Sequence, residues 1–263
     1  MSPTSVHNEK IKNEIKSNIK RIIKVDEKLI SMKNDMDAGG ISPFIEKLFD
    51  RKTILIGKVL QSLYTTMGMS FYEQTAKIIG ELAGYEVFTQ KKLLGKISKE
   101  AENYISTTLD DMEYKPNREI ELEEVKTKSE IAKPQEYPDS TVDVYIITPD
   151  KKEILIDVTT VKPNKKEFRE LKRKTLRWAA MRNSQRPEVD VEPYFAVPYN
   201  PESPKIENTD YKRWQSYYDR KDILVGEEFW RKVSNDLVGI KDIEEIFTEI
   251  SEDLENTTKL LNI

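Results

Sequence analysis

The chain has no cysteine and almost no histidine, and these absences disfavour several kinds of catalytic site. Without cysteine among its 263 residues there are no disulfides, thiolate zinc sites or cysteine nucleophiles, which is typical of a reducing cytoplasm. The single histidine, His7, lies in a polar N-terminal stretch, which argues against catalytic triads and metal centres that depend on histidine. The groups left for chemistry are carboxylates, lysines, arginines and hydroxyls.

Long apolar runs and flexible linkers are also missing. No run reaches the roughly 18–20 residues that cross a membrane, and the start, MSPTSVHNEK, lacks the apolar core of a signal peptide. We therefore expect a cytoplasmic protein without membrane contact. Because no Gly/Ser-rich or Pro-rich linker divides the chain, we expect an N-terminal amphipathic helical segment over 1–40. A single domain would follow over 41–263, with its core at about 70–200.

Net charge is small, but the charges are unevenly distributed. The chain carries a formal charge of −4, which alone argues against a nucleic-acid binder. Residues 151–186 hold twelve basic and four acidic residues, a net charge of +8, whereas residues 241–263 hold two and seven, a net charge of −5. This asymmetry favours one face that receives an anion. The alternative is a solvated helix with many internal ion pairs.

Helical patterns fill the first third of the chain. Isoleucines at steps of three and four predict one amphipathic helix over 9–33, which would dock on the core or contact DNA or a second subunit. Three further helical patterns cover 44–49, 53–63 and 70–84. Ser70 and Glu73 form a predicted capping box at the start of the last one, and Gly84 is its stop.

The middle of the chain alternates β-type runs with helical patterns. Strands are predicted over 85–90, 142–148, 153–160 and 191–198, and helices over 97–109, 165–183, 227–235 and 241–262. Asn164 is a suitable N-cap for the third of these helices, and the charged stretch 112–133 is expected to be irregular. A short turn makes the second and third strands an antiparallel hairpin, and a helical crossover makes the third and fourth parallel. The sequence thus predicts an α/β fold with a mixed central sheet flanked by helices, and helical N- and C-terminal additions.

Each strand of the predicted hairpin carries one aspartate in an apolar setting. Asp143 lies near the start of the first strand and Asp157 near the end of the second. A carboxylate next to buried apolar surface is costly unless a partner compensates it, and two on adjacent strands repel. A divalent cation removes both problems, and a cation held beside a basic helix suits the hydrolysis of phosphodiesters. The alternative interpretation is that both are ordinary aspartates at strand edges or turns.

At these residues the sequence resembles a known family. Asp143 followed by Asp157-Val158-Thr159 is similar to the PD-(D/E)xK nuclease signature. Over a longer part of the chain, the sequence resembles the TdeIII-type group of type II restriction endonucleases. The matching segments are SFYEQTAKIIG (70–80), STVDVYII (140–147), ILIDVTTVKPNKKEFRELKRKTLRWAA (154–180), YFAVPYNP (194–201) and ILVGEEFW (223–230). The resemblance implies a restriction-endonuclease-like core and a homodimeric, Mg²⁺-dependent enzyme. Such an enzyme hydrolyses double-stranded DNA at a short, G·C-rich palindrome of the GGNCC kind, and a cognate DNA methyltransferase acts on the same site.

The resemblance also assigns roles to individual residues. Asp143 and Asp157 would be metal ligands, and Glu73 would match the helix acid that often completes the metal shell. The signature lysine belongs two residues after Asp157, where this chain has Thr159. We expect Lys162 to be the relocated catalytic lysine, although it lies ~10 Å further along an unbroken strand and on its other face. Lysines reaching in from the helix are the next option, namely Lys165 or Lys172.

DNA contacts are expected mainly from the basic segment. The candidates are Lys165, Lys172, Arg173, Arg182, Arg186 and Arg213. If about eight phosphates are neutralised, the logarithm of the binding constant should fall with the logarithm of salt at a slope of roughly −7. Two other functions stay open: a catalytically weakened DNA-binding protein on the same fold, for which Thr159 would mark lost chemistry, and a repair or resolvase-type nuclease.

Overall fold

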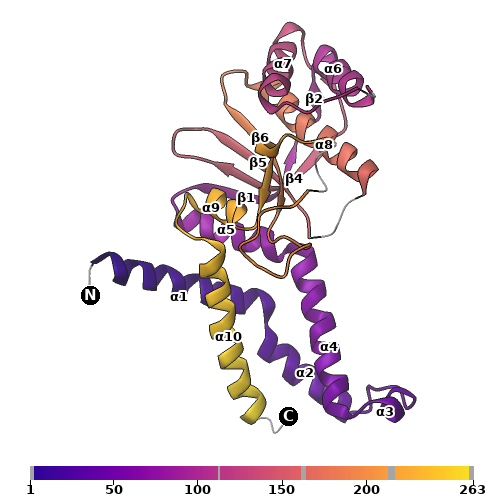
Figure 1. The fold of residues 1–263 in the computed structure, drawn as a ribbon, viewed down its shortest axis with the longest axis vertical. Coiled ribbons are helices and arrows are strands. Elements are labelled where there is room, and N and C mark those ends of the chain that lie inside the picture. The colour runs from indigo at the N-terminus through magenta and orange to yellow at the C-terminus, as the bar shows by residue number, and fades with distance from the viewer. Residues whose placement is uncertain (1–2, 112, 161–163, 213–216, 261–263) are drawn as a thin grey trace. The chain divides into compact units, whose positions relative to one another are not determined.

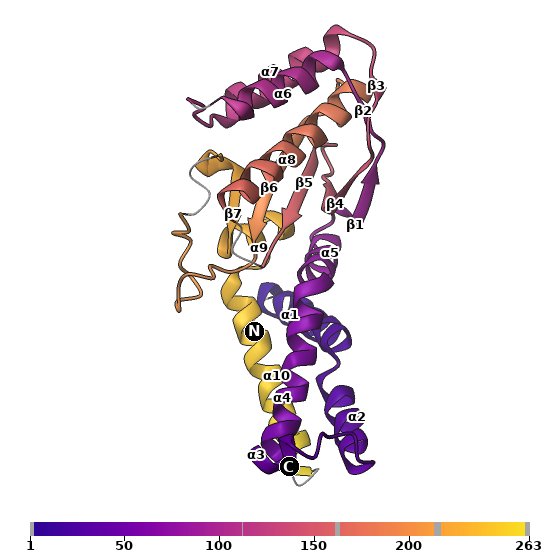
Figure 2. The same ribbon diagram turned by 90° about the vertical axis from the view of Figure 1, so that its right-hand side faces the viewer.

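The computed structural model describes residues 3–111, 113–160, 164–212 and 217–260 (Figures 1 and 2). Its helices are α1 (Pro3–Ile23), α2 (Val25–Asp37), α3 (Ile45–Leu48), α4 (Arg51–Thr66), η1 (Met67–Phe71), α5 (Tyr72–Leu82), α6 (Lys99–Asp110), α7 (Arg118–Ile131), α8 (Lys165–Gln185), η2 (Arg220–Asp222), α9 (Glu227–Ser234) and α10 (Ile240–Leu260). Its strands are β1 (Glu86–Leu93), β2 (Lys96–Ile97), β3 (Gln135–Glu136), β4 (Ser140–Ile147), β5 (Glu153–Val158), β6 (Val191–Val197) and β7 (Ile223–Val225). Within these ranges, none of the helices is both long and apolar enough to cross a membrane.

The chain divides into two compact units. Unit 1 joins Met1–Thr75 to Asp242–Ile263, and unit 2 is the continuous stretch Ala76–Lys241. Unit 1 is helical, and unit 2 contains the sheet. A division by compactness does not define functional domains, so the domain boundaries expected from the sequence, 1–40 and 41–263, stay a prediction.

Unit 1 begins with two helices where the isoleucine pattern predicts one. The single helix over 9–33 is wrong, because Lys24 adopts a left-handed backbone with φ 48° between α1 and α2. The predicted stripe is nevertheless buried, as the low exposure of Ile15 and Ile19 shows. On the side of α1 toward α10, lysines bind acids: Lys12 with Glu245 and Glu249, Lys16 with Glu249 and Asp253, and Lys20 with Asp253. The N-terminal lysines and the C-terminal acids therefore neutralise each other within one unit.

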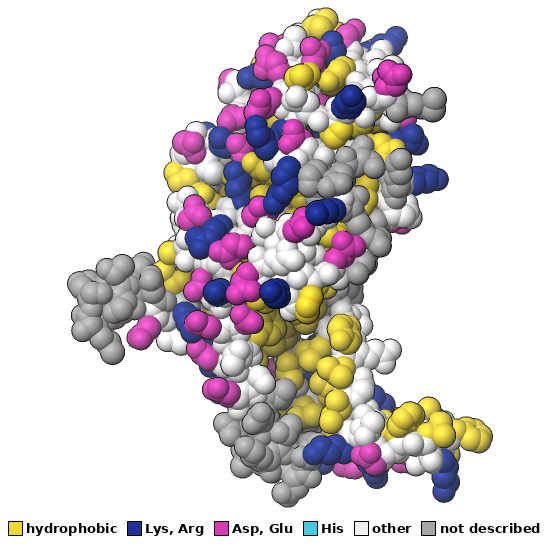
Figure 3. Space-filling model, in the orientation of Figure 1, with side chains coloured by type: hydrophobic (Ala, Val, Ile, Leu, Met, Phe, Trp, Pro, Cys, Tyr) yellow, Lys and Arg dark blue, Asp and Glu magenta, His cyan; other side chains and the backbone are white. Residues whose placement is uncertain are grey.

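The helix predicted from Ser70 has no N-terminus at that residue. α4, η1 and α5 follow one another without a break, and a π-helical turn occupies Met67–Phe71. Ser70 accepts a hydrogen bond from the Gln74 side chain instead of capping a helix, so the predicted capping box with Glu73 is wrong. The predicted stop is confirmed: Gly84 has φ 84°, and Tyr85 donates its backbone N–H to the Gly80 carbonyl. Figure 3 shows hydrophobic side chains on the visible face of α4 and around α3.

Unit 2 is built on a five-stranded mixed sheet, as the sequence predicts. Among the described strands its order is β1-β4-β5-β6-β7, and β2 and β3 form a small separate sheet. β4 is antiparallel to β1 and β5, which confirms the predicted hairpin. β5 and β6 are parallel and joined by α8, which confirms the predicted crossover. β7 is a further parallel strand that the sequence analysis did not include.

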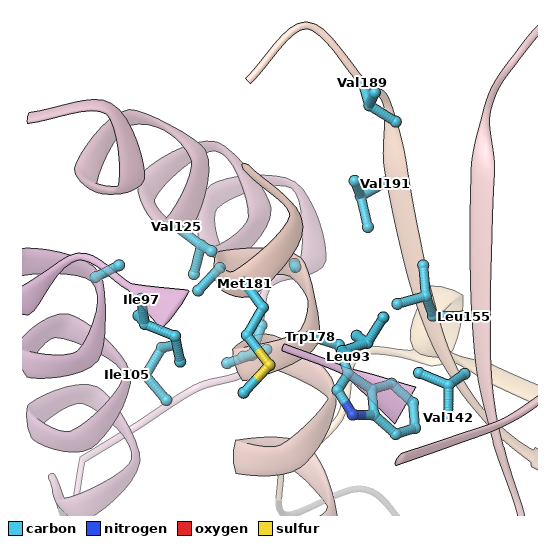
Figure 4. Close-up of a cluster of buried hydrophobic side chains, with 14 of the residues drawn as sticks. Leu93, Ile97, Ile105, Val125, Val142, Leu155, Trp178, Met181, Val189 and Val191 are labelled. Carbon is cyan, nitrogen blue, oxygen red and sulfur yellow. The ribbon is translucent and has the colours of Figure 1, made fainter. Parts of the chain in front are cut away.

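Helices cover both faces of this sheet. α8 lies between the sheet and the α6–α7 pair (Figure 2). Trp178 lies toward Leu155 of β5, Met181 lies toward Ile105 and Val125 of the outer helices, and all belong to one buried hydrophobic cluster (Figure 4). On the opposite face, Gly80 of α5 lies so close to β1 that a Cβ there would come within 2.7 Å of the Val87 side chain.

The segment 112–133, expected to be irregular, contains the helix α7. Asn117 caps it by accepting a hydrogen bond from the Ile120 N–H. Its inner face carries Arg118 and Glu121, which are buried and bind Asp222 and Lys172 respectively. The prediction that this segment is irregular is wrong, because buried ionic groups occupy positions where an amphipathic helix usually has apolar residues.

Candidate active site

The two aspartates of the β4–β5 hairpin lie at the same end of the sheet. Val144 pairs with Ile156, and one further step of this register places Asp143 opposite Asp157. Side chains opposite each other in an antiparallel pair have Cβ atoms roughly 5 Å apart. Asp143 also accepts a hydrogen bond of 2.9 Å from the Val158 N–H, so its carboxylate lies next to the Asp157 strand end. The hairpin therefore brings the two acids together, as the sequence predicts.

Asp143 has a second contact on the other side. Its Oδ1 accepts a hydrogen bond of 3.3 Å from the Gln90 side-chain amide. Gln90 interrupts β1 with a left-handed backbone, φ 51°, so the pairing of β1 with β4 is distorted beside Asp143. A non-glycine residue at positive φ is uncommon, and such positions gather near functional sites. The Asp143 side chain is half-buried and bridges β1 and β5.

Asp157 is buried and paired with a lysine from α8. Only 3% of the residue is exposed, and the Lys174 ammonium donates a short hydrogen bond to its Oδ1. Burial raises the pKa of the Asp157 carboxyl above its usual value, the Lys174 charge opposes that rise, and the nearby Asp143 charge adds to it. Two carboxylates in reach of each other and one cation form the chemical core of the site.

Lys174 is held in place by its own helix. Its ammonium lies 4.9 Å from the centre of the Trp178 ring, one turn further along α8. Trp178 is fully buried and donates its indole N–H to Ser140 Oγ at 2.8 Å, so the ring is fixed against β4. An ammonium above an aromatic face is attracted by the ring quadrupole. About a third of the Lys174 side chain remains exposed, so it can also meet a ligand.

A cavity opens beside this group, where β5 ends and α8 begins. It has a volume of about 590 Å³ and is lined by Thr159, Asn164, Lys166, Glu167, Glu170, Leu171 and Lys174. Asn164 and Glu167 form the capping box that starts α8, as expected for the N-cap at Asn164. The cavity thus joins the catalytic candidates to the N-terminus of a basic helix, which attracts anions.

Comparison with known proteins places the chain in a family. The model of the family described as type II restriction endonuclease, HinfI, matches residues 7–251. The chain belongs to this family. The type II restriction enzyme MjaII of Methanocaldococcus jannaschii is 30% identical to it over 215 residues, covering 76% of this chain and 56% of the relative. The chain therefore spans little more than half the length of that relative. No solved structure matches it.

Several predicted site residues of this HinfI-family chain cannot be placed. Lys162 and Arg213 lie outside the described residues, and the Lys165 side chain is also outside them. Thr159 lies just after β5, where its backbone N–H binds the Ala196 carbonyl and the residue lines the cavity. Glu73 is buried in unit 1, so its predicted place in a metal shell with residues of unit 2 stays a prediction.

Ion pairs engage four of the predicted DNA-binding residues in and just after α8. Lys172 is 1% exposed and binds Glu121 and Asp222, which favours a structural role for its ammonium. Arg173 binds Asp110, Arg182 binds Glu153 through two hydrogen bonds of 2.7 Å, and Arg186 binds Glu188. These side chains therefore face carboxylates of the same chain in this structure.

The donor set suits a hard divalent cation. Among the described residues no group of three or more acidic, histidine or cysteine side chains converges on one point. Mg²⁺ needs fewer protein ligands, since it keeps several waters and is commonly held by one or two carboxylates plus a substrate phosphate. Asp143 and Asp157 supply two carboxylates whose mutual repulsion a cation would relieve, so the residues present fit Mg²⁺.

Lys174 contacts Asp157 and is a candidate that the sequence did not single out. Lys174 stands three residues after Leu171 and four before Trp178, so it shares their side of the helix. A lysine on an inner stripe, opposite a strand that carries a buried aspartate, was the available signal. Nothing else in the sequence distinguishes it within the window 151–186, which holds twelve basic residues.

Proposed function

We propose that this protein is a Mg²⁺-dependent type II restriction endonuclease that hydrolyses double-stranded DNA. The observation that carries the proposal is the meeting of Asp143, Asp157 and Lys174 beside an open cavity, in a chain of the HinfI family. Both carboxylates would hold the metal ion, and Lys174 would take the part of the lysine that the PD-(D/E)xK signature puts at Thr159. The TdeIII-type resemblance and the PD-(D/E)xK assignment belong to this proposal.

The reaction needs a nucleophile, a stabilised phosphate and a leaving group. Bound Mg²⁺ supplies Lewis-acid activation and neutralises charge on the scissile phosphate. Lys174 has three N–H donors, of which Asp157 uses one, so the others can bind a phosphate oxygen and orient the attacking water. The water oxygen bonds to phosphorus, the bond from phosphorus to O3′ breaks, and O3′ takes up a proton as the water loses one. The products are a 5′-phosphate and a 3′-hydroxyl.

Burial of Asp157 prepares it for this role. An almost fully buried carboxylate is poorly hydrated and interacts strongly with any cation nearby. Asp143 stays partly exposed and is oriented by the Val158 N–H and the Gln90 amide. One acid thus gives the site a buried ligand, and the other gives it a partly exposed one.

The finer parts of the proposal come from the resemblance. We expect a homodimer that cuts a short, G·C-rich palindrome of the GGNCC kind, because a two-fold protein matches a two-fold site. We also expect a partner DNA methyltransferase that protects the same sequence, and action in the cytoplasm. MjaII is named a type II restriction enzyme, which supports the class of activity and not the sequence that is cut.

The test is cleavage of unmethylated plasmid DNA with Mg²⁺, using the full chain and its Asp157→Asn and Asp143→Asn variants. We expect discrete fragments from the wild type and a loss of at least about 10³-fold in rate for each variant, because each removes one charged ligand. Thermal unfolding and DNA binding of the variants serve as controls. Binding without cleavage by the wild type would favour the weakened DNA-binding protein, and nicking at branched DNA alone would favour a repair or resolvase-type nuclease.

A further inference from the structure

One face of α4 in unit 1 is exposed and carries no charge. From Thr53 to Thr65 the exposed residues are Thr53, Ile56, Gly57, Leu60, Gln61, Tyr64 and Thr65. Lys58, the charged residue within this stretch, is drawn away to Asp35 and the Gly40 carbonyl. In a chain with 34% charged residues, a solvent-facing helix surface without charge is unusual.

Large apolar side chains make up most of this surface and continue onto α3. Ile56, Leu60 and Tyr64 recur every four residues, so they form one stripe along α4. The short helix α3 and its neighbours add four more exposed apolar residues, beside the exposed charges of Glu46 and Lys47, and α3 packs against α4. The seven residues, with exposed fractions from 40% to 82%, are Phe44, Ile45, Leu48, Phe49, Ile56, Leu60 and Tyr64. We call this surface the α3–α4 face (Figure 3).

The size of the α3–α4 face matches one side of a stable protein interface. Taking roughly 180 Å² for each of these large side chains, the seven expose roughly 700 Å² of surface. A standard interface buries about 800 Å² on each partner, whereas a contiguous apolar patch on a monomer seldom exceeds a few hundred Å². Interface centres are also depleted of charge and enriched in aromatic residues. The α4 stripe carries no charge, and three of the seven residues are aromatic.

We propose that the α3–α4 face pairs with the same face of a second copy of this chain. The uncharged α4 stripe meets its own copy without like-charge repulsion, and the exposed charges of α3, Glu46 and Lys47, are of opposite sign, whereas DNA would require an excess of cations. A two-fold pairing is self-complementary, so each α4 stripe would pack against the other. Gly57 has open space where a Cβ would stand, so two α4 helices can approach closely there. The inference names the partner that cutting a palindrome requires, and in that respect it rests on the proposed function.

The first test measures the oligomeric state of the full chain without DNA, by analytical ultracentrifugation. We expect a dimer at micromolar concentration, and at least a 100-fold weaker association for the Leu60→Glu/Tyr64→Glu double variant, because two buried charges would face each other across the two-fold axis. Ile120→Glu is the matched control, since Ile120 is an equally exposed apolar residue on α7 in unit 2. A monomeric wild type at tens of micromolar, or a double variant that associates as tightly as the wild type, would overturn the proposal.

A second test uses the absence of cysteine in the chain. A Gln61→Cys variant places one thiol on the α3–α4 face, and mild oxidation should link two copies by a disulfide. The same substitution at Ile120 should give little linked dimer. Linking at Ile120 as readily as at Gln61 would mean random collision and would count against the proposed face.

Dimerisation through the α3–α4 face and cleavage of DNA can be tested separately. Asp157→Asn should remain a dimer while losing cleavage, and the Leu60→Glu/Tyr64→Glu variant should fold, as its melting temperature will show. If the wild type is a nuclease, this monomeric variant should nick one strand of a plasmid in place of cutting both. A wild type that dimerises without cutting DNA would leave the interface intact and remove the nuclease assignment.

Discussion

At the scale of single residues, the aspartates could be predicted and the lysine could not. Asp143 and Asp157 stand out because each is a carboxylate within a β-type run, and strand pairing then fixes their distance. The lysine that contacts Asp157 lies on α8, seventeen residues after that aspartate in the chain. Its position depends on how α8 crosses the sheet, which no local pattern contains. Lys162 was preferred because it is closest in sequence to the missing signature position.

Lys174→Met tests the lysine directly. The substitution keeps the apolar stem and removes the ammonium, so we expect cleavage to fall by about 10²–10³-fold while DNA binding changes little. Lys166→Met is the control, because Lys166 lines the same cavity without contacting Asp157. Single-turnover cleavage and thermal melting measure the two effects separately.

The assignment of the catalytic role to Lys162 is tested with the same cleavage assay. If Lys162→Met stops cleavage and Lys174→Met does not, the catalytic lysine follows β5 as the sequence analysis expects. In that case the ammonium of Lys174 would serve to neutralise Asp157 in the folded chain. Loss of activity in Lys174→Met with wild-type rates in Lys162→Met would assign the role to α8.

At the scale of elements, α8 shows what a charge pattern does and does not reveal. Its start at Asn164 and its extent could be predicted, because a cap and a helical pattern are local signals. Its basic faces were interpreted as an anion-binding surface or a solvated helix. Instead, Arg173 and Arg177 bind acids of α6, and Arg182 binds Glu153 of β5. Such long-range partners cannot be read from one segment.

An acid on β6 joins three elements and makes stability depend on pH. Glu192 accepts hydrogen bonds from Lys232 of α9, Lys152 of the β4–β5 turn and Tyr194. Burial alone would raise the pKa of its carboxyl, but these hydrogen bonds outweigh it and lower the pKa to about 2 from an ordinary 4.5. The folded state therefore binds this proton less tightly than the unfolded chain. Its contribution to stability is full above about pH 4.5 and is lost as the pH falls toward 2.

The prediction is that Glu192→Gln destabilises unit 2 at pH 7 by up to about 3 kcal/mol, and by progressively less between pH 4.5 and 2. Urea unfolding of the wild type and the variant at pH 7, 4 and 3 measures the difference. Glu130→Gln is the control, because Glu130 is exposed on α7 and should show no such trend. A difference that stays constant with pH would mean that the Glu192 ion pairs do not stabilise the fold.

At the scale of the whole molecule, charge balance limits how strongly DNA binding depends on salt. A slope of roughly −7 follows if the basic window faces about eight phosphates. Many of those cations already neutralise acids of the same chain, and the lysines of α1 neutralise α10. We therefore expect a shallower slope than −7 when binding is measured by fluorescence anisotropy from 50 to 200 mM salt. A slope of −7 or steeper would show that DNA opens these ion pairs.

The mixed sheet could be predicted from the sequence, whereas the division of the chain into two compact units could not. Strand order around the hairpin and crossover follows from short loops and a right-handed connection, so the mixed sheet could be predicted. The compact units could not, because unit 1 combines residues before Thr75 with residues after Asp242. Only tertiary contacts, such as that between Phe71 and Phe247, reveal this association.

Because unit 1 is assembled from both ends, the two units cannot mature at the same time during synthesis. A ribosome delivers residues 76–241 before residues 242–263, so unit 2 has all of its chain while unit 1 still lacks α10. The acids of α10 that the lysines of α1 bind in the folded chain, Glu245 and Asp253 among them, are made after all of unit 2. If two copies pair through unit 1, as we propose, pairing waits until α10 has been made, and the proposed DNA-cutting dimer would form only after that point.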